Sequence, residues 1–212
     1  MLHIHSFTFN PFSENTYLLF DDTNECVIID PGCYGDSEER EMVSFIELKK
    51  LKPVACLQTH CHIDHVFGNH FVFAKYGLQP QIHTNESIVM NSAMMVAQMY
   101  GVSLKELPEP IISLVDGGTF KFGNTLLRQI LAPGHSPGSI CFYHKESNSL
   151  IAGDVLFQRS IGRTDLPLGD SAALISAIHE KLFVLPNETT VYPGHGPSTT
   201  IGDEKENNPY LT

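Results

Sequence analysis

Apolar residues recur along the chain in short runs that predict two similar series of strands. Residues 2–9 alternate between apolar and polar side chains, which is the period of a half-buried strand. Other apolar or β-branched runs are bounded by turn-forming residues, and they predict strands at 15–21, 25–30, 53–58, 81–84, 111–115, 119–122, 125–132, 139–144, 149–154 and 189–194. The second half of the chain therefore repeats the plan of the first half.

The spacing of an amphipathic helix instead occurs in four segments, at 37–51, 66–77, 86–100 and 171–184. The first of these helices starts with acidic and ends with basic residues, which complement the helix dipole. The third helix carries Met90, Met94, Met95 and Met99, and methionine at helical spacing usually fills a core. We therefore predict that these methionines are buried, with a flexible lid over an acyl-binding groove as the alternative.

Strands interrupted by helices, twice over, predict two packed sheets with helices on their outer faces. The 212 residues, 42% of them hydrophobic, are sufficient for one substantial core. The expected fold class is therefore α+β, in a single domain that spans residues 1–212.

The formal net charge of −11 argues against two classes of partner. Nucleic-acid backbones and anionic membrane surfaces both require clustered Lys and Arg on the protein that binds them. We therefore expect neither nucleic acid nor a membrane as a partner, and the sequence leaves the oligomeric state open. Bound divalent cations would offset part of the charge where they bind.

The cysteines and the amino terminus indicate the compartment. Five cysteines form an odd set without a C-x-x-C pair, so neither a disulfide framework nor a cysteine-ligated zinc site is predicted. The first residues lack the basic and long apolar regions of a signal peptide, and no run approaches eighteen apolar residues. We expect a soluble, cytoplasmic protein.

The strongest chemical signal is the H-x-H-x-D-H array of His60, His62, Asp64 and His65, which lies between a predicted strand and a predicted helix. Side chains at positions i and i+2 of an extended segment point the same way, so His60 and His62 can bind one metal ion. Asp64 and His65, beyond a turn, can then face a second ion. Asp64 could also cap the following helix without any metal, but this alternative leaves the three histidines unexplained.

Three other predicted strand ends carry residues that can bind metals, namely His135, Asp154 and His195. Both histidines occur in Pro-Gly-His-x-Pro, a rigid turn that lowers the entropy lost when a metal binds. Asp30, before Pro31 and Gly32, has two open interpretations: it either bonds nearby backbone amides or orients a metal ligand from behind. The sequence thus offers seven candidate ligands, enough for two metal sites.

These motifs resemble those of the metallo-β-lactamase superfamily, and the resemblance covers nearly the whole chain. It implies a four-layer αββα sandwich. It also implies that His60, His62 and His135 hold one metal, that Asp64, His65 and His195 hold the other, and that Asp154 bridges the two. All seven positions match the family pattern.

Within the superfamily, the stretches GDVLFQRSIGRTDLP and GHGPSTTIGDEKENNPY resemble the small glyoxalase II-like hydrolases. Full-length glyoxalase II enzymes carry an additional C-terminal helical domain that grips glutathione. Here seventeen residues follow His195, so we expect that domain to be absent and a smaller or different thioester to be a candidate substrate.

The resemblance implies hydrolysis of a small-molecule thioester by a metal-bridging hydroxide, with Asp154 and Asp64 as the catalytic carboxylates. Zinc lowers the pKa of bound water from about 15.7 to about 7, so no Ser or Cys nucleophile is needed. Cys61, between two ligands, should point away from the metals. We expect two zinc ions and no further cofactor, although iron or manganese suits the same nitrogen and oxygen ligands.

Two alternatives remain open at this point. Persulfide dioxygenases share most of these ligands and use one iron, but they typically have Cys before and Phe after the G-R-T-D motif, where this chain has Ile161 and Leu166. A non-catalytic zinc module is disfavoured because structural zinc sites usually fill four positions with Cys and His. Within the G-R-T-D motif, Arg163 either holds a substrate carboxylate or pairs with Asp165 to fix the loop.

Overall fold

Two six-stranded sheets form the framework of the chain, and the computed structural model describes residues 1–212. The chain divides into two units that are each built around one of these sheets. The first unit comprises Met1–Ser113 and Lys121–Thr125, and the second comprises Leu114–Phe120 and Leu126–Thr212. No helix is both long enough and apolar enough to span a bilayer.

The first sheet has the strand order β1-β2-β3-β4-β5-β6. Its strands are β1 (His3–Phe9), β2 (Glu14–Phe20), β3 (Glu25–Ile29), β4 (Lys52–Leu57), β5 (Pro80–His83) and β6 (Ile111–Leu114). The helices of this unit are α1 (Asp36–Leu48), α2 (Ile63–Val66), α3 (Asn69–Tyr76) and α4 (Ser87–Tyr100), with the 3₁₀ turn η1 (Thr84–Glu86) before α4. β1, β2 and β3 pair antiparallel, whereas β3, β4 and β5 pair parallel.

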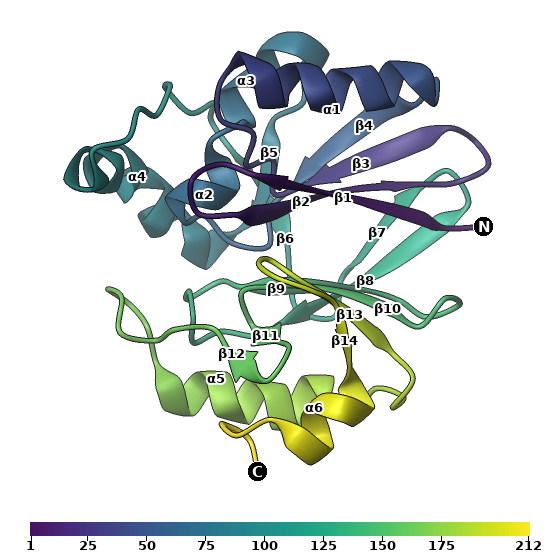
Figure 1. The fold of residues 1–212 in the computed structure, drawn as a ribbon, viewed down its shortest axis with the longest axis vertical. Helices are drawn as coiled ribbons and strands as arrows, with labels where there is room; N and C mark the ends of the chain where they lie inside the picture. The colour runs from purple at the N-terminus through teal and green to yellow at the C-terminus, as the bar shows by residue number, and fades with distance from the viewer. The chain divides into compact units, whose positions relative to one another are not determined.

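Helices α1 and α3 lie over the same face of this first sheet (Figure 1). Met42 and Ile46 of α1 and Val72 of α3 are buried there against Leu18 and Ile28 of the sheet. The crossover from β3 through α1 to β4 joins parallel neighbours, which is the standard use of a connecting helix. This arrangement fixes the end of β4, after which the loop with the candidate metal ligands His60 and His62 begins.

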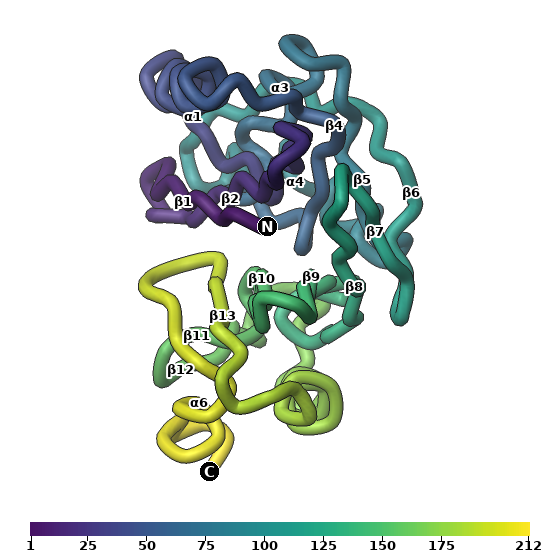
Figure 2. Tube along the Cα trace, turned by 90° about the vertical axis from the view of Figure 1, so that its right-hand side faces the viewer, coloured from purple at the N-terminus to yellow at the C-terminus, as the bar shows by residue number.

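The second sheet has the order β14-β13-β10-β9-β8-β7. Its strands are β7 (Thr119–Phe122), β8 (Thr125–Leu131), β9 (Ile140–His144), β10 (Ser149–Gly153), β13 (Thr190–Pro193) and β14 (Thr199–Thr200), and β11 (Leu156–Phe157) with β12 (Ser160–Ile161) forms a separate hairpin. The helices are α5 (Ser171–Ala177), which continues as the π-helical turn η2 (Ile178–Leu182), and α6 (Ile201–Asn207). Both helices cover one face of this sheet, as the ribbon in Figure 1 and the tube in Figure 2 show.

The predicted strands and the fold class are confirmed, but two helical segments differ from the prediction. The helix expected over 66–77 consists of α2 and α3, separated at Gly68. A Cβ atom at Gly68 would lie 2.5 Å from Cys33 Sγ and 2.7 Å from Pro31 O, so close approach of the Pro31 segment breaks the helix there. The carboxyl-terminal segment, where the sequence analysis predicts no helix, contains α6. Thr200 caps this helix by accepting a hydrogen bond from the Asp203 amide, a local signal that the sequence does contain.

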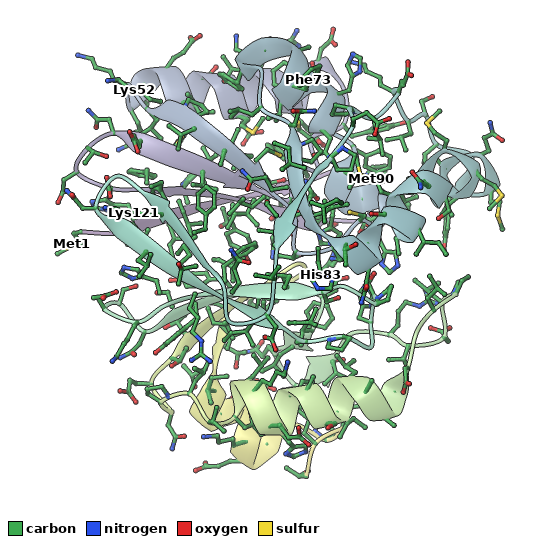
Figure 3. The ribbon with its side chains drawn as sticks, turned by 180° about the vertical axis from the view of Figure 1, so that it is seen from behind. Met1, Lys52, Phe73, His83, Met90 and Lys121 are labelled. Carbon is green, nitrogen blue, oxygen red and sulfur yellow. The ribbon has the colours of Figure 1, made fainter.

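The prediction that the methionines of α4 are buried is wrong for three of the four. Met90 is 5% exposed and lies on the side of α4 that faces the first sheet (Figure 3), but Met94, Met95 and Met99 are 43%, 60% and 78% exposed. The buried stripe of α4 is formed instead by Val89, Met90, Ala93 and Ala97. Small alanines allow α4 to pack closely and leave the longer methionine side chains outside.

Asp21, directly after β2, binds the Gly123–Thr125 turn through hydrogen bonds within the first unit. Its carboxylate accepts hydrogen bonds from the Thr23 amide at 2.9 Å, the Asn124 amide at 2.7 Å and the Thr125 hydroxyl at 3.0 Å. Burial alone would raise the pKa of Asp21, but these hydrogen bonds outweigh it and lower the pKa from 3.8 to about 2. The folded state therefore favours the ionised carboxylate.

This depressed pKa predicts an acid-sensitive contribution to stability. The contribution is complete above the unfolded pKa near 3.8 and is lost as the pH falls through about 2. We expect Asp21→Asn to lower the free energy of unfolding by about 1–2 kcal/mol at pH 7. Chemical denaturation at pH 7, 4 and 2.5 tests this: the deficit should shrink as the pH falls, and a deficit that does not change with pH would contradict it.

Candidate metal centre

The H-x-H-x-D-H array begins after β4 and ends inside α2. His62 has extended backbone angles, φ −65° and ψ 154°, and precedes the first residue of α2. His60 and His65 are 0% exposed, and the ring of His60 lies 4.8 Å from that of His62 and 4.1 Å from that of His65. The three imidazoles therefore gather at the start of α2, as the spacing predicts. Asp64 lies in the first turn of α2, and the capping position belongs to His62.

Cys61 points away from the histidines on either side of it. Its side chain belongs to an apolar cluster with Ile63, Val66 and Ile82, and it is 0% exposed. Burial raises the pKa of Cys26, Cys56 and Cys141 to about 12, and it also raises the pKa of Cys33 and Cys61. Burial therefore favours the neutral thiol at each of the five cysteines.

Hydrogen bonds assign the protonated nitrogen of two imidazoles in this loop. The Thr59 hydroxyl donates to Asp30 Oδ2, so its 3.1 Å contact with His60 Nδ1 must be a hydrogen bond that His60 donates. His65 Nδ1 likewise donates to Asp30 Oδ2 at 3.1 Å. Both rings therefore carry the hydrogen on Nδ1 and keep the lone pair on Nε2. Asp30 Oδ1 also accepts from the backbone amide of Thr59, which lies 29 residues away rather than in the turn that follows Asp30. Its contact with His65 fits the second predicted role, that of orienting a candidate metal ligand.

The separation of Asp64 from His65 is longer than a hydrogen bond and close to that of two ligands of one ion. Asp64 Oδ2 lies 3.7 Å from His65 Nε2. A hydrogen bond between these atoms would be about 2.7–3.2 Å long. Two atoms that bind one zinc ion at about 2.0–2.2 Å with tetrahedral angles lie roughly 3.3–3.6 Å apart. The observed distance is close to the second value.

In the second unit, three strand ends bring His135, Asp154 and His195 together. Gly134 and Gly153, which directly precede His135 and Asp154, have φ angles of +133° and +51°, a backbone conformation that favours glycine. A Cβ atom at Gly134 would lie only 2.4 Å from Leu174 N. These glycines let the backbone adopt angles that other residues disfavour directly before His135 and Asp154, whose side chains are both buried.

Asp154 is the common neighbour of the two histidines. Its Oδ2 atom lies 3.5 Å from His135 Nε2 and 3.5 Å from His195 Nε2. Both distances exceed a hydrogen bond and match the spacing of ligands around one metal ion. His135 Nδ1 donates to the Arg163 carbonyl at 2.8 Å, so this ring too keeps its Nε2 lone pair. The donor set of nitrogen and carboxylate oxygen atoms therefore fits zinc, iron or manganese.

Gly162 leaves no room for a side chain beside this group. A Cβ atom there would lie 1.9 Å from Asp154 O and 3.0 Å from His135 Cβ. We expect Gly162→Ala to displace this backbone and to lower the free energy of unfolding by about 2–3 kcal/mol, measured by chemical denaturation. Gly101→Ala is the matched control, because its φ of +69° carries strain but no atom lies within 4 Å of the new Cβ. A smaller loss in Gly162→Ala than in this control would contradict the prediction.

The Arg163 side chain takes part in an exposed ion pair. Its guanidinium donates two hydrogen bonds of 2.7 Å to Asp165, and it lowers the pKa of that carboxyl to about 2. The side chains of Arg163 and Asp165 are 58% and 68% exposed. This pairing with Asp165 is the contact that the structural alternative requires, and the Arg163 backbone carbonyl accepts the hydrogen bond from His135 Nδ1.

Sequence analysis did not identify several residues that contact the H-x-H-x-D-H array of candidate ligands. Asn10 Nδ2 donates to Asp64 O at 2.9 Å, and Glu86 Oε2 accepts from the Cys61 amide at 2.8 Å. Glu14 is fully buried beside His65, and burial raises its pKa well above the ordinary value. The Thr59 hydroxyl completes this group. Only Thr59 is adjacent to a ligand in sequence, so no local pattern identifies the others.

Comparison with known proteins gives the same class for fold and site. The family model described as the metallo-beta-lactamase superfamily matches residues 9–195. The chain is 38% identical to the probable metallo-hydrolase YqgX of Bacillus subtilis, over 95% of this chain and 93% of that protein. It is 36% identical to the hydroxyacylglutathione hydrolase GloC of Haemophilus influenzae, over 94% of this chain and 93% of that one.

Two crystal structures are similar over almost their whole length. The structure of BLEG-1 B3 metallo-beta-lactamase has a TM-score of 0.88 at 34% identity, and covers 99% of this chain and 100% of its own. The structure of TTHA1623 in a di-iron-bound form has a TM-score of 0.88 at 35% identity, and covers 98% of this chain and 100% of its own. The chain belongs to the metallo-β-lactamase superfamily. Its family relatives include metallo-hydrolases, so the coarse class of activity is metal-dependent hydrolysis.

Proposed function

We propose that this protein hydrolyses small-molecule thioesters of the hydroxyacylglutathione type at a centre of two metal ions. The observation that carries the proposal is the spacing of carboxylate oxygen and imidazole Nε2 atoms, 3.5 Å twice around Asp154 and 3.7 Å between Asp64 and His65. The similarity to a hydroxyacylglutathione hydrolase of Haemophilus influenzae supports the choice of substrate class.

The proposed ligand set is the one that the sequence resemblance implies. One metal takes His60, His62 and His135, the other takes Asp64, His65 and His195, and Asp154 is shared. The Nδ1 hydrogens assigned to His60, His65 and His135 support this set, because each leaves Nε2 as the nitrogen that binds. Zinc is the proposed metal, and the similarity to a di-iron structure makes iron the main competitor.

The chemistry divides between the metals and the side chains. When bound, the metal pair would lower the pKa of a water molecule to about 7 and polarise the thioester carbonyl group. Asp30 holds the Nδ1 proton of His65, and the Arg163 carbonyl holds that of His135, so both rings keep a fixed orientation. Asp154 and Asp64 are the proposed catalytic carboxylates, because they alone among the ligands can accept a proton while remaining close to the reacting atoms.

The test combines metal analysis of the purified protein with a panel of thioesters assayed by thiol release. We expect two equivalents of metal per chain and release of thiol from lactoyl-glutathione or from smaller thioesters. One equivalent of iron, with oxygen uptake on glutathione persulfide and no thiol release, would replace the hydrolase by a dioxygenase. A protein that binds no metal would overturn the centre itself.

A further inference from the structure

We propose that Glu86 is a positioning residue for the metal ligands His60 and His62, an inference that rests on the metal centre proposed above. Glu86 lies 25 residues beyond Cys61 in sequence, yet its Oε2 atom accepts a hydrogen bond of 2.8 Å from the Cys61 amide. Cys61 is the residue between the two histidines. The contact is formed within the first unit and is almost completely removed from solvent, since Glu86 is 1% exposed.

Glu86 does not serve as a helix cap, the usual role of a polar side chain at its position. It immediately precedes α4, at the capping position, but its side chain makes no capping hydrogen bond to that helix. The chain reaches this point from β5, whose last residue, His83, is labelled in Figure 3, through the short turn η1. The Glu86 carboxylate does not cap α4. It accepts a hydrogen bond from the loop that carries His60 and His62.

The surroundings of the carboxylate show that its hydrogen bond is needed. Glu86 is 1% exposed, and Cys61, whose amide its carboxylate binds, belongs to an apolar cluster with Ile82, Val89 and Met90. A carboxylate among such side chains is costly unless hydrogen-bond donors compensate for the lost water. The hydrogen bond to the Cys61 amide, rather than packing, therefore explains a glutamate at this position.

Together with Asp30, Glu86 binds two backbone amides of the loop that carries His60 and His62. Asp30 Oδ1 accepts from the Thr59 amide at 2.6 Å, and Glu86 Oε2 accepts from the Cys61 amide two residues later. The Thr59 amide belongs to the Gln58–Thr59 peptide, and the Cys61 amide belongs to the His60–Cys61 peptide. Glu86 thus fixes the peptide plane directly after His60, one residue before His62.

The test is cobalt(II) affinity of the full-length protein, measured by competition with a chelator, together with the visible absorption of bound cobalt(II). We expect Glu86→Ala to weaken affinity by about 10–100-fold, the usual effect of removing a group that orients a ligand, and to alter the absorption bands. Glu86→Gln keeps an oxygen acceptor for the Cys61 amide, so its affinity should stay within ~3-fold of the wild type. Measurements are made well below the unfolding temperature of each variant.

Glu204 provides the matched control, because it is also fully buried and its Oε2 accepts a backbone amide, that of Arg159, at 2.9 Å. Glu204→Ala should lose stability but keep the cobalt(II) affinity and absorption of the wild type. If Glu86→Ala does not fold, Glu86→Asp, which withdraws the oxygens by one methylene, should show the weakened affinity in its place.

The outcomes separate this inference from the proposed function. Unchanged affinity and absorption in Glu86→Ala or Glu86→Asp, with a wild type that binds metal, would overturn the role of Glu86 alone. A loss in Glu86→Gln as large as that in Glu86→Ala would overturn the hydrogen bond as its basis. A wild type that binds no cobalt(II) would overturn both the metal centre and this inference.

Discussion

Replacement of Asp154 by alanine is expected to abolish turnover of thioesters and to reduce the metal content of the purified protein. One oxygen of Asp154, Oδ2, lies 3.5 Å from both His135 Nε2 and His195 Nε2. Loss of a group that merely orients a ligand costs about 10–100-fold, so loss of a ligand shared by two metals should cost at least ~10³-fold in kcat/KM. Thiol release and metal analysis measure the two effects.

Asp203→Asn is the control for this variant. Asp203 is another carboxylate of the second unit, partly exposed, and it pairs with Arg159 at 3.0 Å. Its replacement should leave kcat/KM and metal content unchanged. Near-normal turnover in Asp154→Ala would show that the shared role assigned to this carboxylate is wrong.

Removal of the metals is expected to lower the melting temperature as well as to stop turnover. With metal present at about 1,000 times its Kd, the folded state gains about 4 kcal/mol over the unfolded chain. For a chain of this length this corresponds to a melting temperature lower by ~8–16 °C after treatment with a chelator. Thermal unfolding before treatment, after treatment and after addition of zinc measures the effect.

The Asp154→Ala variant also serves as the comparison for metal removal. Because it lacks the shared carboxylate, its melting temperature should respond less to the chelator than that of the wild type. An identical melting temperature in metal-loaded and metal-depleted wild type would contradict a metal centre that binds the folded state.

The candidate ligands can be identified from sequence because their chemistry depends on local spacing. His60 and His62, separated by one residue at a strand end, have few explanations other than a metal, and the structure groups His60 with His65 and Asp30. The supports of these ligands could not be predicted in the same way. Asn10 and Glu86 act through contacts across 54 and 25 residues, which depend on the fold rather than on neighbouring residues.

The errors in the helices have physical causes of two kinds. The period of α4 identified a helix, but apolar residues occupy both of its faces, so the spacing of the methionines did not reveal which face is buried. The break between α2 and α3 depends on the approach of Pro31 to Gly68, a contact between distant segments. The helix α6 was not predicted although Thr200 and Asp203 form a recognisable helix start, because this polar segment lacks apolar residues at helical spacing.

The assignment of Lys121–Thr125 to the first unit has a consequence for dissecting the protein. The polypeptide passes from one unit to the other three times, after Ser113, Phe120 and Thr125. A fragment that ends at Ser113 would leave the Asp21 carboxylate without the amide of Asn124 and the hydroxyl of Thr125. Two fragments divided at this point should therefore regain the native state only when co-expressed, since the later fragment must supply a turn that completes the earlier one.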